Sequence, residues 1–443
     1  MTSKVFLRPR PLAATDVADV PAVSFLFQDD GSLVVGDKRF RHLAGVLPAA
    51  NNDAYARAVQ PLVPAVADAG VMACCFAYGH TGSGKTHTIF GYGGDDGVCQ
   101  RAVHDLFAAI AGGTGGSDVS ARASSDNAEE FAGGRRLVQA RFYELYNGKV
   151  FDLLNARQPG FVRLDAHGDV HVRSATTMGP DGEVLTQSLH AAYARDADEL
   201  LAVITSGRRL RAEGTSELHD ESSRSHAVLE LEVVTRELAQ ARQDVVVAES
   251  RVVPVGKARD GQYIAIQSKL YVKAADGSYA ASGAGPDPAE QARLDELQAQ
   301  MHVVEDVLAQ AKKRVVEAKA RCGGGSLVFV DLAGAEYTGE GLARNSRELA
   351  EAKEINTSLL ALKECVRRSA QTQAQKDADV ASHIPFRNSK LTMVLKPFLL
   401  DRSRAAAHTV MVATVSSAET HRSKSLNTIK YAALVADAFK QEA

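Results

Sequence analysis

The sequence predicts an α/β fold in which helices cover both faces of a central, mostly parallel sheet, and three observations indicate it. Short apolar runs alternate along the chain with segments of helical periodicity. Of the 443 residues, 45% are apolar and 24% charged, values typical of a folded globular protein. A glycine-rich turn joins one apolar run to a helical segment, as is common where a parallel strand enters a helix.

The alternation covers nearly the whole chain and predicts one large three-layer domain over residues 1–443. The runs with the composition of buried strands are 71–78, 136–146, 227–234, 326–334 and 409–416. Helical periodicity covers 98–110, 190–207, 345–370, 389–400 and 425–440.

Two stretches interrupt this pattern. Residues 111–136 are rich in Gly, Ser and Asp and almost free of large apolar side chains, so we expect a flexible surface loop. Residues 235–325 form an insertion of helical, coiled-coil-like character. Its apolar positions from Leu294 to Ala318 recur at spacings of three and four.

The insertion admits two arrangements. A weaker apolar seam, from Leu238 to Val252, precedes the strong one, and a segment of strand-like composition, 262–272, lies between them. An α-hairpin whose limbs pack on each other and a long helix lying on the body of the domain both fit this pattern. An exposed strong seam would suit pairing with another helix, so residues 288–320 are a candidate surface for a helical partner.

Charge and hydropathy exclude several classes of protein. Lys plus Arg number 51 and Asp plus Glu 54, a net charge of −3, so the chain has no overall basic field for nucleic acid. No apolar run is long enough for a membrane span, and the N-terminal residues do not resemble a signal peptide. The five cysteines lack metal-ligand or disulfide spacing, so we expect reduced core thiols in a cytoplasmic protein.

A phosphate-binding loop follows the run 71–78. The residues GHTGSGKT match G-x-x-x-x-G-K-[ST] and precede a helical start. In such a loop backbone N–H groups surround phosphate oxygens, Lys85 reaches the terminal phosphates and the Thr86 hydroxyl ligates Mg²⁺. The candidate nucleotide-binding residues are Gly79, His80, Thr81, Gly82, Ser83, Gly84, Lys85 and Thr86. The fold is therefore expected to be that of a P-loop NTPase.

Two further motifs suit a triphosphate site. Asp331 follows a buried run and precedes Leu-Ala-Gly, so its carboxylate can face the metal while Gly334 offers its N–H to a γ-phosphate. Ser222 and Ser223 open the cluster SSRSH just before another strand. No N-K-x-D motif for reading guanine is present, which favours ATP over GTP.

Taken in order, these motifs resemble the kinesin motor domain. The blocks that carry the resemblance are RPRP (8–11), AYGHTGSGKTHT (77–88), FYELYNGKVFDLLN (142–155), SSRSHA (222–227), DLAGAE (331–336), EAKEINTSLLALKEC (351–365), HIPFRNSKLT (383–392) and LNTIKYA (426–432). The blocks FYELYNGKVFDLLN (142–155) and INTSLLALKEC (355–365) are most similar to the kinesin-13 group. The resemblance implies the kinesin motor fold, a microtubule-stimulated MgATP hydrolase that moves along or remodels microtubules, and a place on the cytoskeleton in the cytoplasm.

The resemblance also implies roles for single residues. Those expected around the adenine are Arg8, Arg10, Pro11 and His87. Those expected at the γ-phosphate or the Mg²⁺ are Thr86, Ser222, Ser223, Asp331 (through water) and Gly334. Arg224 and Glu336 would form the ion pair that closes the two switches. Glu351 and Asn356 would relay the nucleotide state to the track surface.

A local basic surface would meet the acidic microtubule. In residues 383–404 five basic residues face one Asp, a balance of +4. The resemblance places tubulin contacts on this stretch and on the end of the preceding helix. The candidate microtubule-binding residues are Lys363, Arg367, Arg368, Arg387 and Lys390.

The sequence departs from the family pattern at several positions. His219 stands where the family has an Asn three residues before the serine cluster, and imidazole cannot reproduce the donor and acceptor geometry of an amide. This leaves an alternative open: a kinesin-like microtubule-binding adaptor with weak or no ATP turnover. His80 replaces a usual Gln, and we expect a smaller effect. Residues 13–40 lack the basic finger of the kinesin-13 group, which weakens a depolymerase interpretation. A soluble nucleotide kinase is disfavoured because it has no use for the blocks from 351 to 432.

Overall fold

The computed structural model describes most of the chain. The described residues are 3–12, 23–29, 31–112, 135–165, 168–213, 224–273, 278–283, 285–335, 346–374, 384–399 and 407–440. Nearly all of the loop expected at 111–136 therefore lies outside the described residues. So do His219, Ser222, Ser223 and Glu336.

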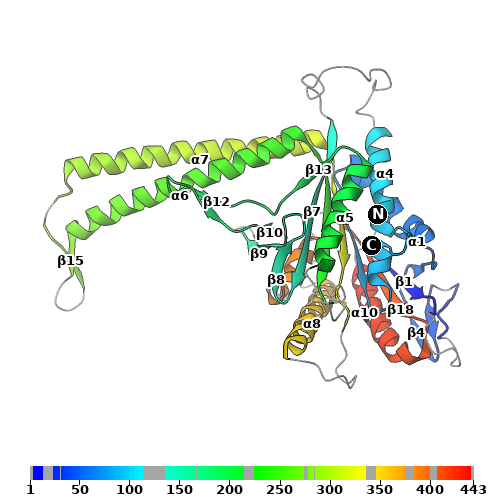
Figure 1. The fold of residues 1–443 in the computed structure, drawn as a ribbon. Coiled ribbons are helices and arrows are strands. Elements are labelled where there is room, and N and C mark those ends of the chain that lie inside the picture. The colour runs from blue at the N-terminus through cyan, green and yellow to red at the C-terminus, as the bar shows by residue number, and fades with distance from the viewer. Residues whose placement is uncertain are drawn as a thin grey trace, which may run out of the picture.

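An eleven-stranded sheet forms the centre of the domain (Figure 1). Its order is β10-β9-β8-β7-β14-β17-β6-β18-β1-β5, and β13 pairs with β7. These strands are β1 (Lys4–Arg10), β5 (Gly45–Val46), β6 (Met72–Tyr78), β7 (Arg136–Tyr146), β8 (Lys149–Asp152), β9 (Gln158–Leu164), β10 (Val170–Arg173), β13 (Ala192–Ala194), β14 (His226–Thr235), β17 (Ser326–Asp331) and β18 (Ala407–Ser416). All five strands expected from the sequence are confirmed, as β6, β7, β14, β17 and β18.

The remaining described strands form three smaller sheets. They are β2 (Leu26–Phe27) with β3 (Leu33–Val35) and β4 (Lys38–Phe40), β11 (Thr177–Met178) with β12 (Val184–Leu185), and β15 (Tyr271–Lys273) with β16 (Tyr279–Ala281).

The central sheet is mixed, so the prediction of a mostly parallel sheet is wrong. β5, β1, β18, β6 and β17 run parallel to one another. Helices lie in the connections from β5 to β6 and from β17 to β18, as crossovers between parallel strands commonly have. From β17 through β14 and β7 to β10 the pairs are antiparallel. One of these pairs has a tight connection: β7 turns into β8 at Asn147 and Gly148, both at positive φ (48° and 66°).

Helices cover both faces of the sheet, which confirms the three-layer architecture. One layer is α1 (Asn51–Ala58), α2 (Val63–Asp68), α4 (Val98–Gly112) and α5 (Ala197–Glu213). The other is α8 (Ser346–Ala374), α9 (Lys390–Leu399) and α10 (Arg422–Lys440). Short helices are α3 (Lys85–Phe90), η1 (Gln60–Leu62), η3 (Phe386–Asn388) and η4 (Glu419–His421). All five expected helices exist, although the one expected from 190 begins at Ala197, because β13 occupies 192–194.

Each layer has its own apolar core. Leu106 and Phe142 are fully buried on the α4–α5 side, and Leu395 and Ile429 on the α9–α10 side. All five cysteines are buried and reduced, as expected. In the part of the chain that the structure describes, no helix has the length and apolar character needed to cross a bilayer.

The insertion is an antiparallel α-hairpin, which we call the arm. Its limbs are α6 (Arg236–Leu270) and α7 (Pro288–Cys322), each 35 residues long, or ~50 Å by the rise of an α-helix. The arm leaves the domain between β14 and β17 (Figure 1). The hairpin arrangement is thus confirmed, and the long helix lying on the body is excluded. The segment 262–272 is helical up to Leu270, so its strand-like composition was misleading.

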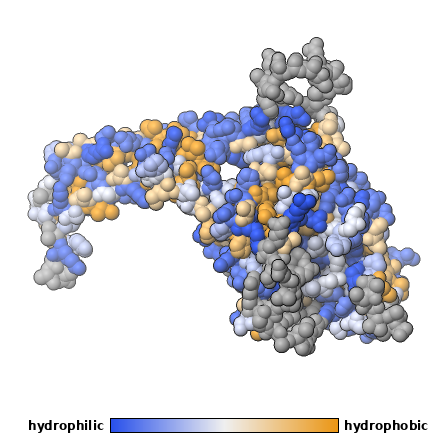
Figure 2. Space-filling view, in the orientation of Figure 1, coloured by the Kyte–Doolittle hydropathy of each residue, from blue (hydrophilic) through white to orange (hydrophobic). Residues whose placement is uncertain are grey.

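The two limbs bury the predicted seam against each other. The buried apolar residues on the facing sides are Leu238, Ala241, Ala248, Ile266, Leu294, Leu297, Met301, Ala311 and Ala318. Ion pairs from Lys269 to Glu290 (2.5 Å) and from Lys312 to Glu249 (3.3 Å) tie the limbs together. The strong seam therefore does not face a second chain. A helical partner for residues 288–320 could use only the outer face of α7, where polar side chains cover much of the visible surface (Figure 2).

The root of the arm has a small core of its own. Val234, Leu238, Ala241, Ala318 and Cys322 form a cluster separate from the two main cores. Farther out, β12 lies beside α6 (Figure 1). The arm therefore contacts the domain at its root and at one β-hairpin, and its two limbs pack on each other.

We predict that the arm can be removed without unfolding the domain. Replacing residues 236–322 by a short turn should leave a soluble protein that binds ADP, with a melting temperature within about 5 °C of the parent, because the main cores contain no arm residue. Circular dichroism and calorimetric titration measure both properties. A matched shortening of 243–315 retains the root cluster. If both proteins are insoluble, the arm packs on the domain after all.

Candidate functional site

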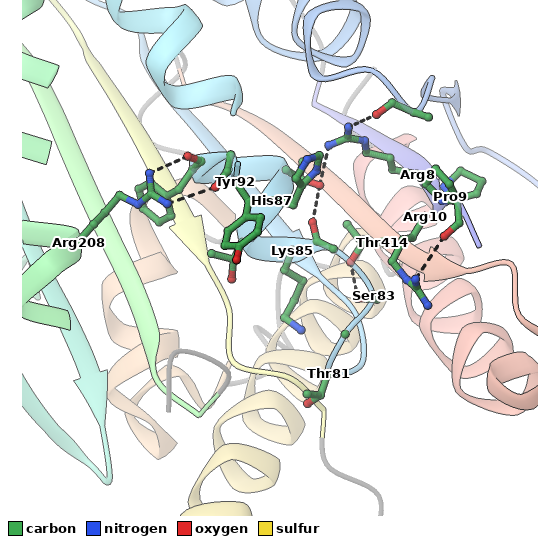
Figure 3. A pocket seen from close by; sticks show the side chains of 18 of the residues that line it. Arg8, Pro9, Arg10, Thr81, Ser83, Lys85, His87, Tyr92, Arg208 and Thr414 are labelled. Atoms are coloured by element: carbon green, nitrogen blue, oxygen red, sulfur yellow. Dashed lines mark hydrogen bonds between the residues drawn. The ribbon is translucent and has the colours of Figure 1, made fainter. Parts of the chain in front are cut away.

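The glycine loop joins β6 to α3 beside a cavity of about 810 Å³, a volume suited to a nucleotide (Figure 3). The lining residues come from β1, the loop, the segment after α3 and the end of α5. They are Arg8, Pro9, Arg10, Pro11, Ala49, Thr81, Gly82, Ser83, Gly84, Lys85, Thr86, His87, Thr88, Phe90, Gly91, Tyr92, Arg208, Arg211, Ala212 and Thr414. The structure thus brings the residues expected around the adenine (Arg8, Arg10, Pro11 and His87) together with residues 81–86 of the phosphate-binding loop.

The Lys85 side chain folds back onto the phosphate-binding loop. Its buried Nζ donates hydrogen bonds to the carbonyl oxygens of Gly79 (3.1 Å) and His80 (2.9 Å). Gly84 has φ +100°, a conformation that L side chains rarely adopt, so only glycine makes this turn without strain. The ammonium therefore lies among loop atoms, where it can exchange carbonyl oxygens for phosphate oxygens.

A buried carboxylate links the loop to β17 and α5. Asp331 Oδ2 accepts hydrogen bonds from Thr86 Oγ1 (2.8 Å) and from Arg211 Nη1 (2.8 Å). The second oxygen, Oδ1, is buried and has no hydrogen-bond partner among the described residues. A hydroxyl and a carboxylate with a spare oxygen are the hard donors that Mg²⁺ prefers. The residues present therefore fit the metal that the sequence implied.

Arg211 and Arg208 were not predicted. Arg211 lies in the last turn of α5 and is 5% exposed, and its Nη2 also donates to the Ser225 carbonyl (2.9 Å). Arg208 donates to the carbonyls of Phe90 (3.0 Å) and Gly91 (3.2 Å), just after α3. Nothing in the periodicity of α5 marks these two positions, because their partners come from distant parts of the chain.

The expected base-binding residues lie around the same cavity. Arg8 Nη1 donates to Thr88 Oγ1 (2.8 Å) and Nη2 to the Ala49 carbonyl (2.6 Å), and burial lowers its pKa. His87 Nε2 lies 3.4 Å from Asp95 Oδ2. Burial and the neighbouring Arg8 lower the pKa of His87, while Asp95 opposes this. Figure 3 shows Arg8 and Arg10 on one side of the loop and Tyr92 on the other.

Two predicted loop residues do not line the cavity. A Cβ on Gly79 would lie 2.3 Å from the Thr414 carbonyl oxygen, so this glycine serves the packing of the loop on β18. The His80 ring is buried against His421, with ring centroids 5.1 Å apart, and its Nδ1 donates to the Thr81 carbonyl (2.8 Å). Burial lowers the pKa of His80 to about 4. The His80 ring thus faces away from the cavity, and the expected contact of this loop residue with nucleotide stays a prediction.

The segment after β17 touches the loop directly. A Cβ on Gly334 would lie 2.0 Å from Thr81 Oγ1, and Ala335 N donates to the Gly79 carbonyl (3.3 Å). Gly334 is thus placed beside the phosphate loop, as a sensor of the γ-phosphate must be. The expected contacts of Ser222 and Ser223 lie outside the described residues and stay predictions.

Arg224 pairs with an acid on α8. Its Nη1 donates to Glu351 Oε2 (3.0 Å), and Tyr146 Oη donates to the other Glu351 oxygen. Glu351 is 3% exposed, so this is a largely buried ion pair. The expected pair of Arg224 with Glu336 lies outside the described residues and stays a prediction.

His226 connects three elements. Its Nδ1 accepts from Ala333 N (2.9 Å) and its Nε2 donates to Ser358 Oγ (2.9 Å) on α8, which fixes a neutral tautomer. Burial, together with the positive charges of Arg211 and Lys85, lowers the pKa of His226 to about 3. The imidazole thus ties the backbone after β17 to α8 only while it is uncharged.

The predicted track-binding residues lie on α8, η3 and α9. Arg367 and Arg368 both donate to Glu364 (2.8 Å each), and these bonds lower the pKa of Glu364 to about 2. Burial lowers the pKa of Lys390, and the charges of Arg163 and Lys149 add to the effect. Lys149 and Arg163, on β8 and β9, therefore extend the basic surface. They were not predicted, because they are distant in the chain from the other basic residues.

Comparisons with known proteins agree with this architecture. The model of the family described as the kinesin motor domain matches residues 37–255 and 278–437. Kinesin-like protein KIF24 of Mus musculus is 25% identical over 444 residues, which cover 97% of this chain and 23% of the relative. Kinesin-like protein KIN-13B of Arabidopsis thaliana is 27% identical over 382 residues, covering 86% of this chain and 37% of the relative. The chain thus spans well under half the length of these curated relatives.

Solved structures share the fold. A KIF14 dimer with AMP-PNP in complex with a microtubule has a TM-score of 0.62 at 20% identity, with 99% of this chain and 94% of that chain covered. The structure of a fast kinesin has a TM-score of 0.60 at 21% identity, with 98% and 91% covered.

We predict that protonation of His226 destabilises the domain. The pKa is about 6.5 in the unfolded chain and about 3 in the folded one, so the stability is full above pH 6.5 and falls as the pH drops toward 3. When the pH is lowered from 7.5 to 5.5, protonation of His226 should reduce the free energy of unfolding by about 1.4 kcal/mol. Urea denaturation at both pH values measures it.

The variant His226→Phe is the control for this prediction. It should be less stable at pH 7.5 by about 2 kcal/mol, because it leaves the Ala333 N–H without its acceptor, yet lose less stability than the parent on acidification. Equal losses in the two proteins would mean that His226 does not titrate in this way.

Proposed function

Because the chain belongs to the kinesin motor domain family, we propose that it is a microtubule-binding motor that hydrolyses MgATP and couples hydrolysis to movement along, or remodelling of, microtubules. The observation that supports this most directly is the buried Asp331 carboxylate. It holds Thr86 and keeps a spare oxygen beside the Lys85 loop. We place the protein on the cytoskeleton in the cytoplasm.

Hydrolysis of a phosphoanhydride needs positioning and charge neutralisation rather than a covalent nucleophile. Bound Mg²⁺ supplies part of that neutralisation, and Thr86, Asp331 and Ser223 are the residues proposed to hold it, Asp331 through water. Lys85 moves from loop carbonyls to phosphate oxygens. Ser222 and the Gly334 N–H are proposed to contact the γ-phosphate.

The same site can signal to α8. Arg224 donates to Glu351 and His226 donates to Ser358. Two residues that come just after Ser222 and Ser223 therefore contact the first half of α8. A γ-phosphate that draws in Ser222 and Ser223 also pulls on the backbone of Arg224 and His226, which follow them in the chain. Rearrangement of α8 is then a direct mechanical consequence of nucleotide binding, and α8 carries Lys363, Arg367 and Arg368.

The track surface that we propose combines α8, η3 and α9 with the tips of β8 and β9. Arg367 and Arg368 share Glu364, so Arg387 and Lys390 are the better pair for testing this surface. Phe386 packs under the Lys396 ammonium, 4.5 Å from its ring centroid, which keeps η3 in place.

A second candidate function is an adaptor of the same shape with weak ATP turnover. It is favoured by the His219 departure and by His80, whose buried ring approaches the start of α10 instead of the nucleotide cavity. The two candidates differ in turnover alone, and both bind microtubules.

The first test is steady-state ATP hydrolysis with and without microtubules. The parent should be stimulated at least tenfold, Lys85→Ala should lose nucleotide binding, and Thr86→Ala should lose more than 90% of the Mg²⁺-dependent rate. A parent that binds ATP and microtubules with no stimulated turnover would establish the adaptor. If Lys85→Ala hydrolyses ATP like the parent, the site is misplaced.

The second test addresses the track surface. Arg387→Glu with Lys390→Glu should weaken co-sedimentation with microtubules about tenfold or more, while the affinity for ATP without microtubules stays unchanged, because exposed charges act through long-range attraction. Arg251→Glu with Lys257→Glu, on the arm, is a charge-matched control. Equal weakening in both variants would show that net charge, rather than this surface, governs binding.

A further inference from the structure

The limb α7 carries a line of exposed side chains beside its buried seam, and we call it the outer stripe. Each of its residues directly precedes a residue of the seam from Leu294 to Ala318. The outer stripe therefore repeats the spacing of three and four and runs about 100° round the helix from the seam. Its eight side chains are all exposed, and they are Arg293, Glu296, Gln300, Val303, Val307, Gln310, Arg314 and Glu317.

Two valines form the centre of the outer stripe. Val303 is 62% exposed and Val307 42% exposed, and they lie one helical turn apart. Exposed valines are common on protein surfaces and do not by themselves indicate a partner. The order of the polar residues on either side of them does.

That order is complementary to its own reverse. Around a two-fold axis at residue 305, a second α7 running antiparallel places every arginine of the outer stripe opposite a glutamate. Residue 305 is also the midpoint of α7, so the two helices overlap along their whole length. The facing pairs are Arg293 with Glu317, Glu296 with Arg314, Gln300 with Gln310, and Val303 with Val307.

Other arrangements of the same two helices lose this match. A parallel pair sets each charge against its own copy, so like charges face each other. Sliding the antiparallel pair by one heptad brings Val307 against Glu296 in one direction and Val303 against Arg314 in the other. The pattern thus favours the centred antiparallel pair over these alternatives.

The charge of the whole helix has the same polarity. Residues 288–306 contain five acidic residues and one basic residue, whereas residues 307–322 contain five basic residues and one acidic residue. This segregation extends well beyond the terminal turns in which the helix dipole acts. An antiparallel second α7 places each acidic half beside a basic half.

We propose that α7 pairs with α7 of a second copy of this chain, antiparallel and through the outer stripe. Figure 1 shows α7 as the limb farther from β12, so the domain leaves it accessible. The two domains of the dimer then lie at opposite ends of the paired arms. The proposal stands whether or not the chain turns over ATP.

The charges of the outer stripe already have partners within one chain. Arg293 donates to Glu296 (2.5 Å), Arg314 lies 3.6 Å from Asp244, and Glu317 lies 3.9 Å from Lys313. Such exposed pairs contribute little, so their exchange for pairs with the second copy is nearly neutral. Burial of the valines drives the association, while the charges fix its register and direction.

The test is sedimentation velocity of the full chain in MgADP, at about 2–200 µM protein. The parent should change from monomer to dimer across this range. Glu296→Arg with Glu317→Arg makes the outer stripe wholly positive and should weaken the dimer about tenfold or more. Arg293→Glu with Arg314→Glu makes it wholly negative and should do the same. An equimolar mixture of the two variants should associate at least as tightly as the parent, because all charged pairs are again opposite.

Two control variants change the net charge equally outside the outer stripe. Asp295→Arg with Glu305→Arg, on α7, and Arg251→Glu with Lys257→Glu, on α6, should each change the dimer affinity less than twofold. Thermal melts establish that all variants are folded. A parent that stays monomeric, equal weakening in the controls, or a mixture that does not associate overturns the proposal.

Engineered thiols test the direction of the pair. Val303→Cys and Val307→Cys are made in separate proteins, and the natural cysteines are buried. In the antiparallel pair the two new thiols face each other only when the proteins are mixed, so mild oxidation should link the mixture and neither protein alone. Each variant linking to itself as readily as in the mixture would show a parallel pair and overturn the proposal.

Discussion

The buried Asp331 carboxylate is the interaction on which the rest of this site depends. It joins three parts of the chain that are remote in sequence, because Thr86 follows the glycine loop and Arg211 ends α5. A charge at 1% exposure is tolerated only when it is paired and hydrogen-bonded, and removing one partner of such a pair costs about 3–5 kcal/mol. The spare Oδ1 is the exception, since it is buried without a hydrogen-bond partner among the described residues.

Strand direction explains how this one carboxylate is connected to α8. β14 begins at His226 and β17 ends at Asp331, so the antiparallel pair brings both segments to one end of the sheet. The Ala333 N–H and the Arg224 guanidinium therefore lie within reach of α8 through His226 and Glu351. A fully parallel sheet would place these two segments at opposite ends.

Much of this arrangement could be predicted from local sequence, and the failures have physical causes. Strand and helix periodicity located β6, β7, β14, β17 and β18, and the motif from Gly79 to Thr86 located the nucleotide site. Strand direction was predicted wrongly, since periodicity does not encode which neighbour a strand pairs with. The role of Arg211 and the pairing of Arg224 with Glu351 became visible only in the fold, because the partners are 120 and 127 residues apart.

The insertion shows the same limit in another form. Seam spacing identified α7 well, but whether that seam would pair with α6 or with another chain depends on the length and return path of the connection. The strand-like composition of residues 262–272 suggested a strand in what is the end of α6, where packing against α7 favours helix instead. His80 was expected at the nucleotide because of its place in the motif, although the room beside His421 decides where its ring lies.

The arm continues directly from β14 and returns directly into β17, the two strands whose other ends meet the nucleotide site. A stiff rod joined to a strand pair in this way is a lever. With a length of ~50 Å, a twist of about 6° between the strands and the rest of the sheet displaces its tip by about 5 Å. The leverage also works in reverse: a load at the tip applies torque to the strands that carry His226 and Asp331.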